Sequence, residues 1–206
     1  WGSHLESHPD WLRTPGIEIS GGSLGQIPGV AVGRALGMRR NGPDHNDRTV
    51  YVLTGDGECN EGSVWEAFMA ASHYRLDNLV FVVDYNKVQQ FGFPKDGNLK
   101  HRVNPLTQVP EKWRAFGWNV LDVDGHDFDV LVPAMEEAKA TRGRPTCIIA
   151  NTIKWKGVSF MEGQNKWHGS PVDDATWRAI SSNAPICSLR NTMGKNGSAP
   201  AVATVT

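Results

Sequence analysis

Residues 49–83 read TVYVLTGDGECNEGSVWEAFMAASHYRLDNLVFVV and contain the pattern that decides the fold. Thr49–Leu53 is a short run of β-branched and aromatic residues, typical of a strand, and it stops at Gly55–Gly57. Leu79–Val83 is apolar throughout, as expected for a central strand that is covered on both faces. The stretch therefore predicts two strands of one parallel sheet joined by a crossover.

The connection between these two strands has the pattern of a helix. Ser63 and Glu66 have the spacing of a capping box, in which a hydroxyl N-cap is followed three residues later by a glutamate. We therefore expect a helix that opens at Ser63 and continues to about His73.

The same alternation of strand and helix recurs along the chain. Trp118–Val123 and Thr146–Ala150 have the composition of strands, and Phe128–Thr141 between them has that of a helix. Val30–Met38 is rich in small residues, which suits a helix packed closely on a neighbour. The sequence thus predicts an α/β fold with a doubly wound, mostly parallel sheet and helices on both faces.

Length and composition narrow the class of protein. The chain of 206 residues can form one domain, which we expect over residues 1–180, and residues 181–206 are polar and read as a flexible tail. With 21 Lys and Arg against 22 Asp and Glu, no net charge attracts nucleic acid or an anionic membrane. Three scattered cysteines argue against a disulfide framework, so we expect a cytoplasmic protein.

Two polar residues follow the two best-defined strands. Asp56 ends the first strand, and Asn86 stands just beyond the second, 86 − 56 = 30 residues later. Working groups in such folds gather at the carboxyl ends of strands, so neighbouring strands would bring Asp56 and Asn86 to one crevice. Two oxygen ligands of this kind suit Mg²⁺ that also holds a phosphate. Taken alone, Gly55–Gly57 is more often a simple turn.

Four segments together resemble the transketolase family. GDGECNEGSVWEAFMAASHYRLDNLVFVVDYNK, residues 55–87, is similar to the thiamine diphosphate signature, in which GDG opens a segment of about thirty residues closed by Asn. TPGIEISGGSLGQ, residues 14–26, is similar to the family's glycine-rich cofactor loop. Residues 112–127, KWRAFGWNVLDVDGHD, and 151–169, NTIKWKGVSFMEGQNKWHG, resemble a later strand and the segment that bears a Lys and a His.

The resemblance implies a thiamine diphosphate-binding fold with thiamine diphosphate and Mg²⁺ as cofactors. Asp56 and Asn86 would bind Mg²⁺ by their side chains, and Val88 by its backbone carbonyl. The remaining cofactor contacts implied are Gly22, Ser23, Leu24, Gly57, Glu61, Gln90, Lys154 and His168.

The resemblance also implies three catalytic residues. His8 would face the thiazolium and the substrate, Glu61 would lie at a subunit contact beside the partner's catalytic glutamate, and His168 would lie over the reacting centre. Each residue also has a plainer interpretation. His8 could be a surface histidine. The negative charge of Glu61 could stabilise the N-terminus of the following helix through the helix dipole. His168 could pack beside Trp167 without a catalytic role.

The function that we expect is that of the diphosphate-binding subunit of a split transketolase. It would transfer a two-carbon ketol unit and would be completed by a separate pyrimidine-domain subunit in an α₂β₂ assembly, with a sugar phosphate or 2-oxo acid as substrate. One alternative is the decarboxylating component of a 2-oxo acid dehydrogenase, which passes an acyl unit to a lipoyl or acyl-carrier domain. A non-catalytic scaffold with this fold is the other alternative.

Two positions depart from the family pattern. Ile27 follows the GSLGQ loop where the family usually has Gly, and Trp155 replaces a customary Gly beside Lys154. A large ring at Trp155 would lie close to the cofactor or substrate. We therefore hypothesise that the substrate is not a standard one.

Overall fold

The computed structural model describes residues 8–41, 48–89, 106–170, 172–175, 177–178 and 202–204. Its helices and strands, with the two 3₁₀ turns named η, are α1 (Gln26–Arg40), β1 (Val50–Gly55), η2 (Glu58–Asn60), α2 (Gly62–His73), β2 (Leu79–Tyr85), α3 (Val109–Ala115), β3 (Asn119–Asp124), α4 (Phe128–Ala140), β4 (Thr146–Asn151), η4 (Asn165–Trp167) and β5 (Val202–Thr204). Their order alternates strand and helix as the sequence predicts.

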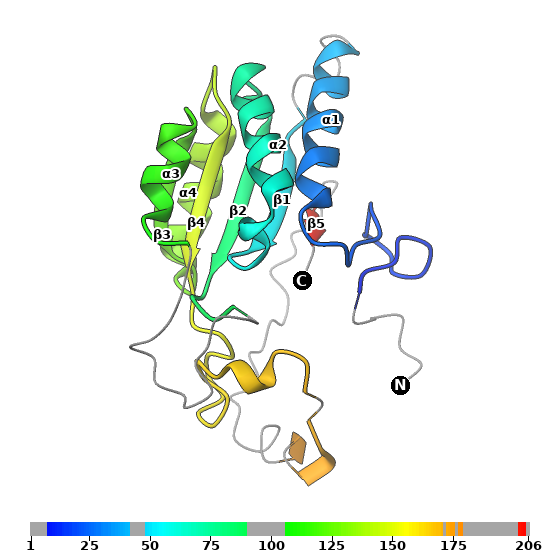
Figure 1. The fold of residues 1–206 in the computed structure, drawn as a ribbon, viewed down its shortest axis with the longest axis vertical. Helices are drawn as coiled ribbons and strands as arrows, with labels where there is room; N and C mark the ends of the chain where they lie inside the picture. The colour runs from blue at the N-terminus through cyan, green and yellow to red at the C-terminus, as the bar shows by residue number, and fades with distance from the viewer. Residues whose placement is uncertain are drawn as a thin grey trace.

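The strands form one sheet in the order β3-β4-β2-β1-β5, and every pair is parallel. The expected neighbours β1 and β2 do lie side by side, which confirms the crossover predicted from residues 49–83. All strands run the same way, so their carboxyl ends lie along one edge of the sheet (Figure 1). The loop of residues 152–170 extends from that edge.

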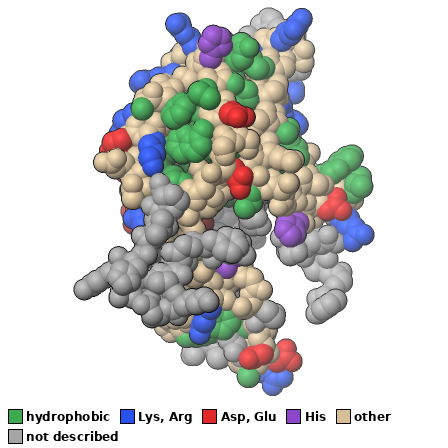
Figure 2. Space-filling view, viewed as in Figure 1, with side chains coloured by type: hydrophobic (Ala, Val, Ile, Leu, Met, Phe, Trp, Pro, Cys, Tyr) green, Lys and Arg blue, Asp and Glu red, His purple; other side chains and the backbone are tan. Residues whose placement is uncertain are grey.

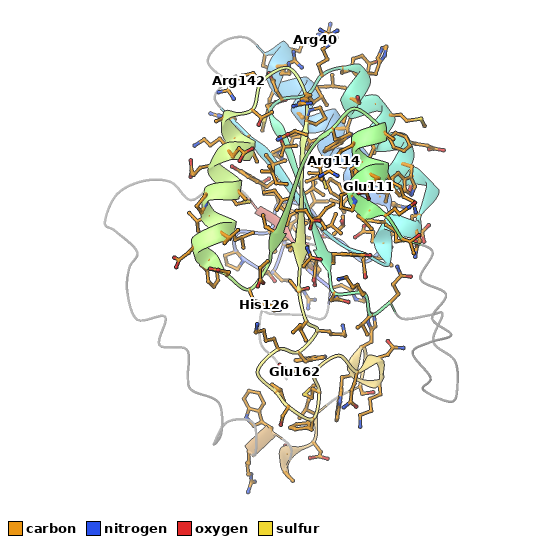
Figure 3. The ribbon with its side chains drawn as sticks, turned by 90° about the vertical axis from the view of Figure 1, so that its left-hand side faces the viewer. Arg40, Glu111, Arg114, His126, Arg142 and Glu162 are labelled. Atoms are coloured by element: carbon orange, nitrogen blue, oxygen red, sulfur yellow. The ribbon has the colours of Figure 1, made fainter. Side chains whose placement is uncertain are left out.

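Helices cover both faces of the sheet, as predicted. The larger core joins α1, α2 and α3 to one face, where Val52, Phe81 and Ile149 point. The smaller core joins Ala134 and Ala138 of α4 to Val80, Ile148 and their neighbours on the opposite face. Figure 3 shows the two layers edge-on, with Glu111 and Arg114 of α3 on one side and Arg142, just beyond α4, on the other. The predicted doubly wound α/β fold is therefore confirmed.

An aromatic cluster fixes the short helix α3, which the sequence patterns did not predict. Trp113 is fully buried against Phe68 of α2, and Phe68 in turn makes edge contacts with Phe81 and Trp118. A helix of only seven residues has little stability of its own, so the burial of this one tryptophan holds it.

One local prediction differs from the structure. Helix α2 begins at Gly62 with Glu61 at its N-cap, and Ser63 lies inside the first turn rather than capping it. The Ser63 hydroxyl donates instead to the Gly25 carbonyl at 2.9 Å. Ile27, which departs from the family pattern, is buried in the first turn of α1 and is part of the larger hydrophobic core.

Residues 202–204, which fall in the predicted tail, form β5 at the edge beside β1. The rest of the tail, apart from these residues, lies outside the described part of the chain. Among the described residues, no helix has the length and apolarity that crossing a membrane requires.

Candidate functional site

The register of the sheet aligns the ends of three strands. Gly55 of β1 lies opposite Asp84 of β2, and Asp84 lies opposite Ala150 of β4. The residues that follow each strand, Asp56 and Thr152 among them, therefore emerge at one edge. The structure thus brings the two predicted metal ligands, Asp56 and Asn86, to neighbouring strand ends.

Asp56 is a buried carboxylate, with an exposed fraction of only 3%. Its Oδ2 accepts a hydrogen bond of 2.8 Å from the backbone N–H of Lys87, and the N–H of Gly57 donates to the carboxylate as well. Burial nevertheless raises the pKa of Asp56 to about 6, with a further contribution from the nearby charge of Asp84. The positive charge of Lys154 acts in the opposite direction. The site thus favours a cation beside this carboxylate.

The turn that follows β2 wraps around Asp56. The Oδ1 of Asn86 accepts from the N–H of Val88 at 2.8 Å, which is an Asx turn. Lys87 between them adopts a φ of 63°, the left-handed region that non-glycine residues enter at a cost of about 1–2 kcal/mol. That conformation is the one in which its N–H reaches Asp56. The three predicted metal ligands, Asp56, Asn86 and Val88, are therefore linked in one hydrogen-bonded turn.

Gln89 is a contact of the site that no sequence pattern predicted. Its Nε2 donates to the backbone carbonyl of Asp56 at 3.3 Å, and its Oε1 accepts from Asn60 at 2.8 Å. The predicted contact, Gln90, lies outside the described residues.

The glycine-rich loop before α1 lies against the predicted catalytic residues. Gly22 has a φ of 137°, and a Cβ added to it would come within 2.9 Å of the His8 ring. A Cβ on Gly25, whose φ is 84°, would come within 2.7 Å of the Glu61 side chain. Ser23 and Leu24 have exposed side chains. The loop thus places His8 beside Gly22 and Glu61 beside Gly25.

Glu58 connects this loop to the GDG segment, and it too was not predicted from the sequence. Its side chain is 3% exposed, and its Oε1 accepts from the N–H of Gly25 at 2.9 Å. Burial raises its pKa above the ordinary value. The available signal was an acidic residue directly after GDG, but nothing in the sequence named Gly25 as its partner.

Lys154 and His168 lie in the loop that follows β4. Lys154 is half-buried, and its charge acts on both Asp56 and His168. Partial burial and this charge lower the pKa of His168, which favours a neutral imidazole at pH 7. Trp167 packs edge-on against Phe160, with ring centroids 5.8 Å apart. Lys154 is therefore coupled electrostatically to both Asp56 and His168.

His126, to which the sequence patterns gave no role, anchors the start of that loop. Its Nε2 accepts from the N–H of Ile153 at 2.7 Å. Figure 3 shows His126 at the edge where the strands end and Glu162 farther out in the loop. Gly125 allows this approach, because a Cβ there would lie 2.6 Å from a methyl carbon of Thr152. His126 thus positions the segment that carries Lys154.

The donor set fits Mg²⁺ bound together with a phosphate. One carboxylate, one amide oxygen and a backbone carbonyl leave most of an octahedral shell to other oxygen ligands. Within the described ranges, no group of three His, Cys, Asp or Glu could hold a metal ion by itself. The residues present therefore fit a metal that arrives with an anionic cofactor.

A hollow beside the site has a different character. Its volume is about 360 Å³, and it lies where Figure 2 shows hydrophobic side chains between α2 and α3. Most of its lining is apolar, from residues such as Trp65, Leu106 and Phe116. It does not suit a diphosphate, so the strand ends remain the candidate site.

The first prediction concerns the substitution Asp56→Asn. The pKa of Asp56 is higher in the folded than in the unfolded chain, so this carboxyl makes the fold less stable as the pH rises from about 4 through about 6. In Mg²⁺-free buffer at pH 8, the variant should be more stable than the parent by up to about 3 kcal/mol. At pH 3, below both pKa values, the two should be equal. Urea unfolding measures both values, with the exposed Glu66→Gln as control. A variant less stable than the parent at pH 8 would contradict the prediction.

The second prediction concerns Lys154→Met. Loss of the charge should raise the pKa of His168 and that of Asp56 together, because the ammonium lowers both. NMR titration of the His168 ring, assigned with a His168→Gln variant, measures the first shift. Lys139→Met on α4 removes a charge elsewhere and should leave the His168 pKa in place. An unchanged titration in Lys154→Met would show that the two groups are not coupled.

Comparisons with known proteins agree with this geometry. The family model described as transketolase, thiamine diphosphate binding domain, matches residues 1–185. The 6-deoxy-6-sulfo-D-fructose transketolase subunit SqwG of Clostridium sp. (strain MSTE9) is 45% identical over 178 residues, which are 86% of this chain and 62% of that protein. An apulose-4-phosphate transketolase subunit of Actinobacillus succinogenes is 42% identical over 166 residues, 81% of this chain and 56% of that protein.

Solved structures give the same result. The transketolase of Campylobacter jejuni superposes with a TM-score of 0.74 at 32% identity, over 88% of this chain and 28% of that one. This chain spans about 60% of the length of the curated subunits that it matches. It belongs to the transketolase family and carries that family's thiamine diphosphate-binding domain.

Proposed function

We propose that this chain provides the cofactor-binding part of a thiamine diphosphate- and Mg²⁺-dependent transketolase that transfers a two-carbon ketol unit. The observation that supports it best is the turn in which Lys87 donates to Asp56 and Val88 to Asn86, at the ends of adjacent parallel strands. This turn offers oxygen ligands at the place where doubly wound folds bind phosphates.

The residues of the chain would divide the work as follows. Asp56, Asn86 and the Val88 carbonyl would hold Mg²⁺, and Gly57 would let the backbone approach the diphosphate. When bound, thiamine diphosphate would supply the nucleophilic and electron-accepting chemistry that two-carbon transfer needs. Lys154 would place its positive charge toward the anionic groups. These contacts would hold the cofactor in position before the chemical step begins.

The histidines would handle protons. The pKa of His168 is lowered, so the imidazole is mostly neutral at pH 7 and can accept a proton from a substrate hydroxyl. His8 lies over Gly22 at the glycine-rich loop, where it can stabilise a developing alkoxide. Glu61 is exposed at the start of α2, so a partner subunit can reach it.

A second subunit would complete the site. The curated relatives are named as subunits, which supports a partner that carries the pyrimidine-binding domain. We extend this to an α₂β₂ assembly with the cofactor between chains. The two described cysteines, Cys59 and Cys147, are buried free thiols, which is consistent with a place in the reducing cytoplasm.

Ketol transfer is favoured over the two alternatives. The relatives of this chain are named transketolases or transketolase subunits, which supports a sugar acceptor over a lipoyl or acyl-carrier domain. A scaffold without catalysis has no need of a buried carboxylate with a raised pKa, which costs stability. We propose a ketose with an anionic terminal group, phosphate or sulfonate, as the donor.

The third prediction tests cofactor binding. The full-length subunit, mixed with its pyrimidine-domain partner, should bind thiamine diphosphate only with Mg²⁺ present, and Asp56→Asn should abolish this binding. Isothermal titration calorimetry measures it, and Glu66→Gln is the matched control for a charge lost elsewhere. Binding without Mg²⁺, or binding that survives Asp56→Asn, would refute the proposed site.

The fourth prediction concerns the substrate. Trp155 is 43% exposed and has a φ of 60°, a left-handed conformation that favours glycine. Trp155→Gly therefore fits the existing backbone and should leave the unfolding free energy within about 1 kcal/mol of the parent. Its kcat/KM should shift several-fold toward ordinary pentose and heptulose phosphates. Equal kcat/KM values in variant and parent would exclude Trp155 from substrate selection.

A further inference from the structure

Asp84 lies among the site residues, yet neither the motif nor the proposed mechanism uses it. It stands near the end of β2, the central strand, in register with Gly55 of β1 and Ala150 of β4. Its backbone carbonyl accepts from the N–H of Asp56 at 3.2 Å. The residue is half-buried, so its side chain lies between the ends of three strands.

Both oxygens of the Asp84 carboxylate accept hydrogen bonds. Oδ1 accepts from the hydroxyl of Thr152, the first residue after β4. Oδ2 accepts from the Nδ2 of Asn86 at 3.3 Å. Thr152 thus holds the carboxylate in place, and the carboxylate in turn holds the Asn86 side chain.

The hydrogen bond between Asp84 and Asn86 determines which end of the Asn86 side chain is free to bind a cation. An ionised carboxylate only accepts hydrogen bonds, so the amide nitrogen of Asn86 must be the end that faces it. The oxygen is then at the other end, where it accepts from the N–H of Val88. A carbonyl oxygen has a second lone pair, and that lone pair can bind a metal. An amide turned the other way would offer a cation two hydrogens.

We propose that Asp84 is a positioning residue, which holds the amide of Asn86 so that its oxygen and not its nitrogen is presented to Mg²⁺. The inference rests on the proposed function, because it assumes that Asn86 is a metal ligand. It assigns the end of β2 two tasks: Asn86 binds the cation, and Asp84, two residues earlier, sets its orientation.

The test starts with Asp84→Asn, which is nearly isosteric. An asparagine at this position has one acceptor and one donor group, so either orientation of Asn86 is satisfied and the preference is lost. The Mg²⁺ concentration that half-saturates binding of thiamine diphosphate should rise about 10-fold to 100-fold, as for other residues that orient a metal ligand. The assembled complex with the partner subunit is titrated with Mg²⁺ in a calorimeter.

A matched control is available on the neighbouring strands. The carboxylate of Asp122 on β3 accepts from the Nδ2 of Asn151 at 2.6 Å, so Asp122→Asn makes the same chemical change in the same kind of pair. It should leave the Mg²⁺ requirement unchanged. An equal loss in Asp122→Asn and Asp84→Asn would overturn the proposal.

A double-mutant cycle separates orientation from simple charge. Asp84→Asn also removes a negative charge near the cation, and that effect would persist without the Asn86 side chain. In an Asn86→Ala background, Asp84→Asn should therefore have almost no further effect on the Mg²⁺ requirement. An equal loss in both backgrounds would mean that Asp84 acts through its charge alone, and it would refute the orientation role.

A second measurement needs no variant at position 84. In the unliganded parent chain, the side-chain NH₂ of Asn86 should exchange with water more slowly than that of the exposed Asn41, as seen by NMR. Equal exchange rates would overturn the proposal even if Asp84→Asn failed to fold. A parent complex that shows no Mg²⁺-dependent cofactor binding would instead refute the proposed function, whereas a normal parent with an unaffected Asp84→Asn would refute only this inference.

Discussion

The desolvated carboxylate of Asp56 is the constraint on which the site depends. A carboxylate removed from water must receive hydrogen bonds, and here backbone amides of Gly57 and Lys87 supply them. For the Lys87 amide to reach it, the chain after β2 has to enter the left-handed region. That turn also places Asn86 beside Val88. One buried charge thus accounts for the strained backbone and for the grouping of the predicted metal ligands.

The charge of Asp56 interacts with the charged groups around it. Asp84 brings a second negative charge close to Asp56, which makes the unliganded site unfavourable for anions and favourable for a cation. Lys154 offsets part of that charge from the loop after β4. The lowered pKa of His168 follows in part from the same lysine. Because Lys154 lies in the loop after β4, the position of this loop affects the pKa values of both Asp56 and His168.

Much of the fold and of the candidate site could be predicted from the sequence. The other features depend on contacts that local sequence patterns do not show. Strong apolar runs such as Leu79–Val83 predict the parallel strands, and their order then aligns Asp56 with Asn86. Helix α2 begins earlier than its pattern predicts, because Ser63 bonds the distant Gly25 rather than its own helix. Helix α3 has no comparable pattern, because the burial of Trp113 creates it. The roles of Glu58 and His126 depend on partners 33 and 27 residues away, and local patterns cannot name such partners.

The loop after β4 is held to the neighbouring strand ends at its first two residues. Thr152 and Ile153 are fixed from both sides, by Asp84 of β2 and by His126 after β3. Trp155 follows two residues later, after these anchors, on a backbone that would accept glycine. The Trp155 side chain takes no part in the bonds that hold Thr152, Ile153, Asp56 and Asn86. A change of the Trp155 side chain therefore alters the surface of the loop and leaves these bonds in place.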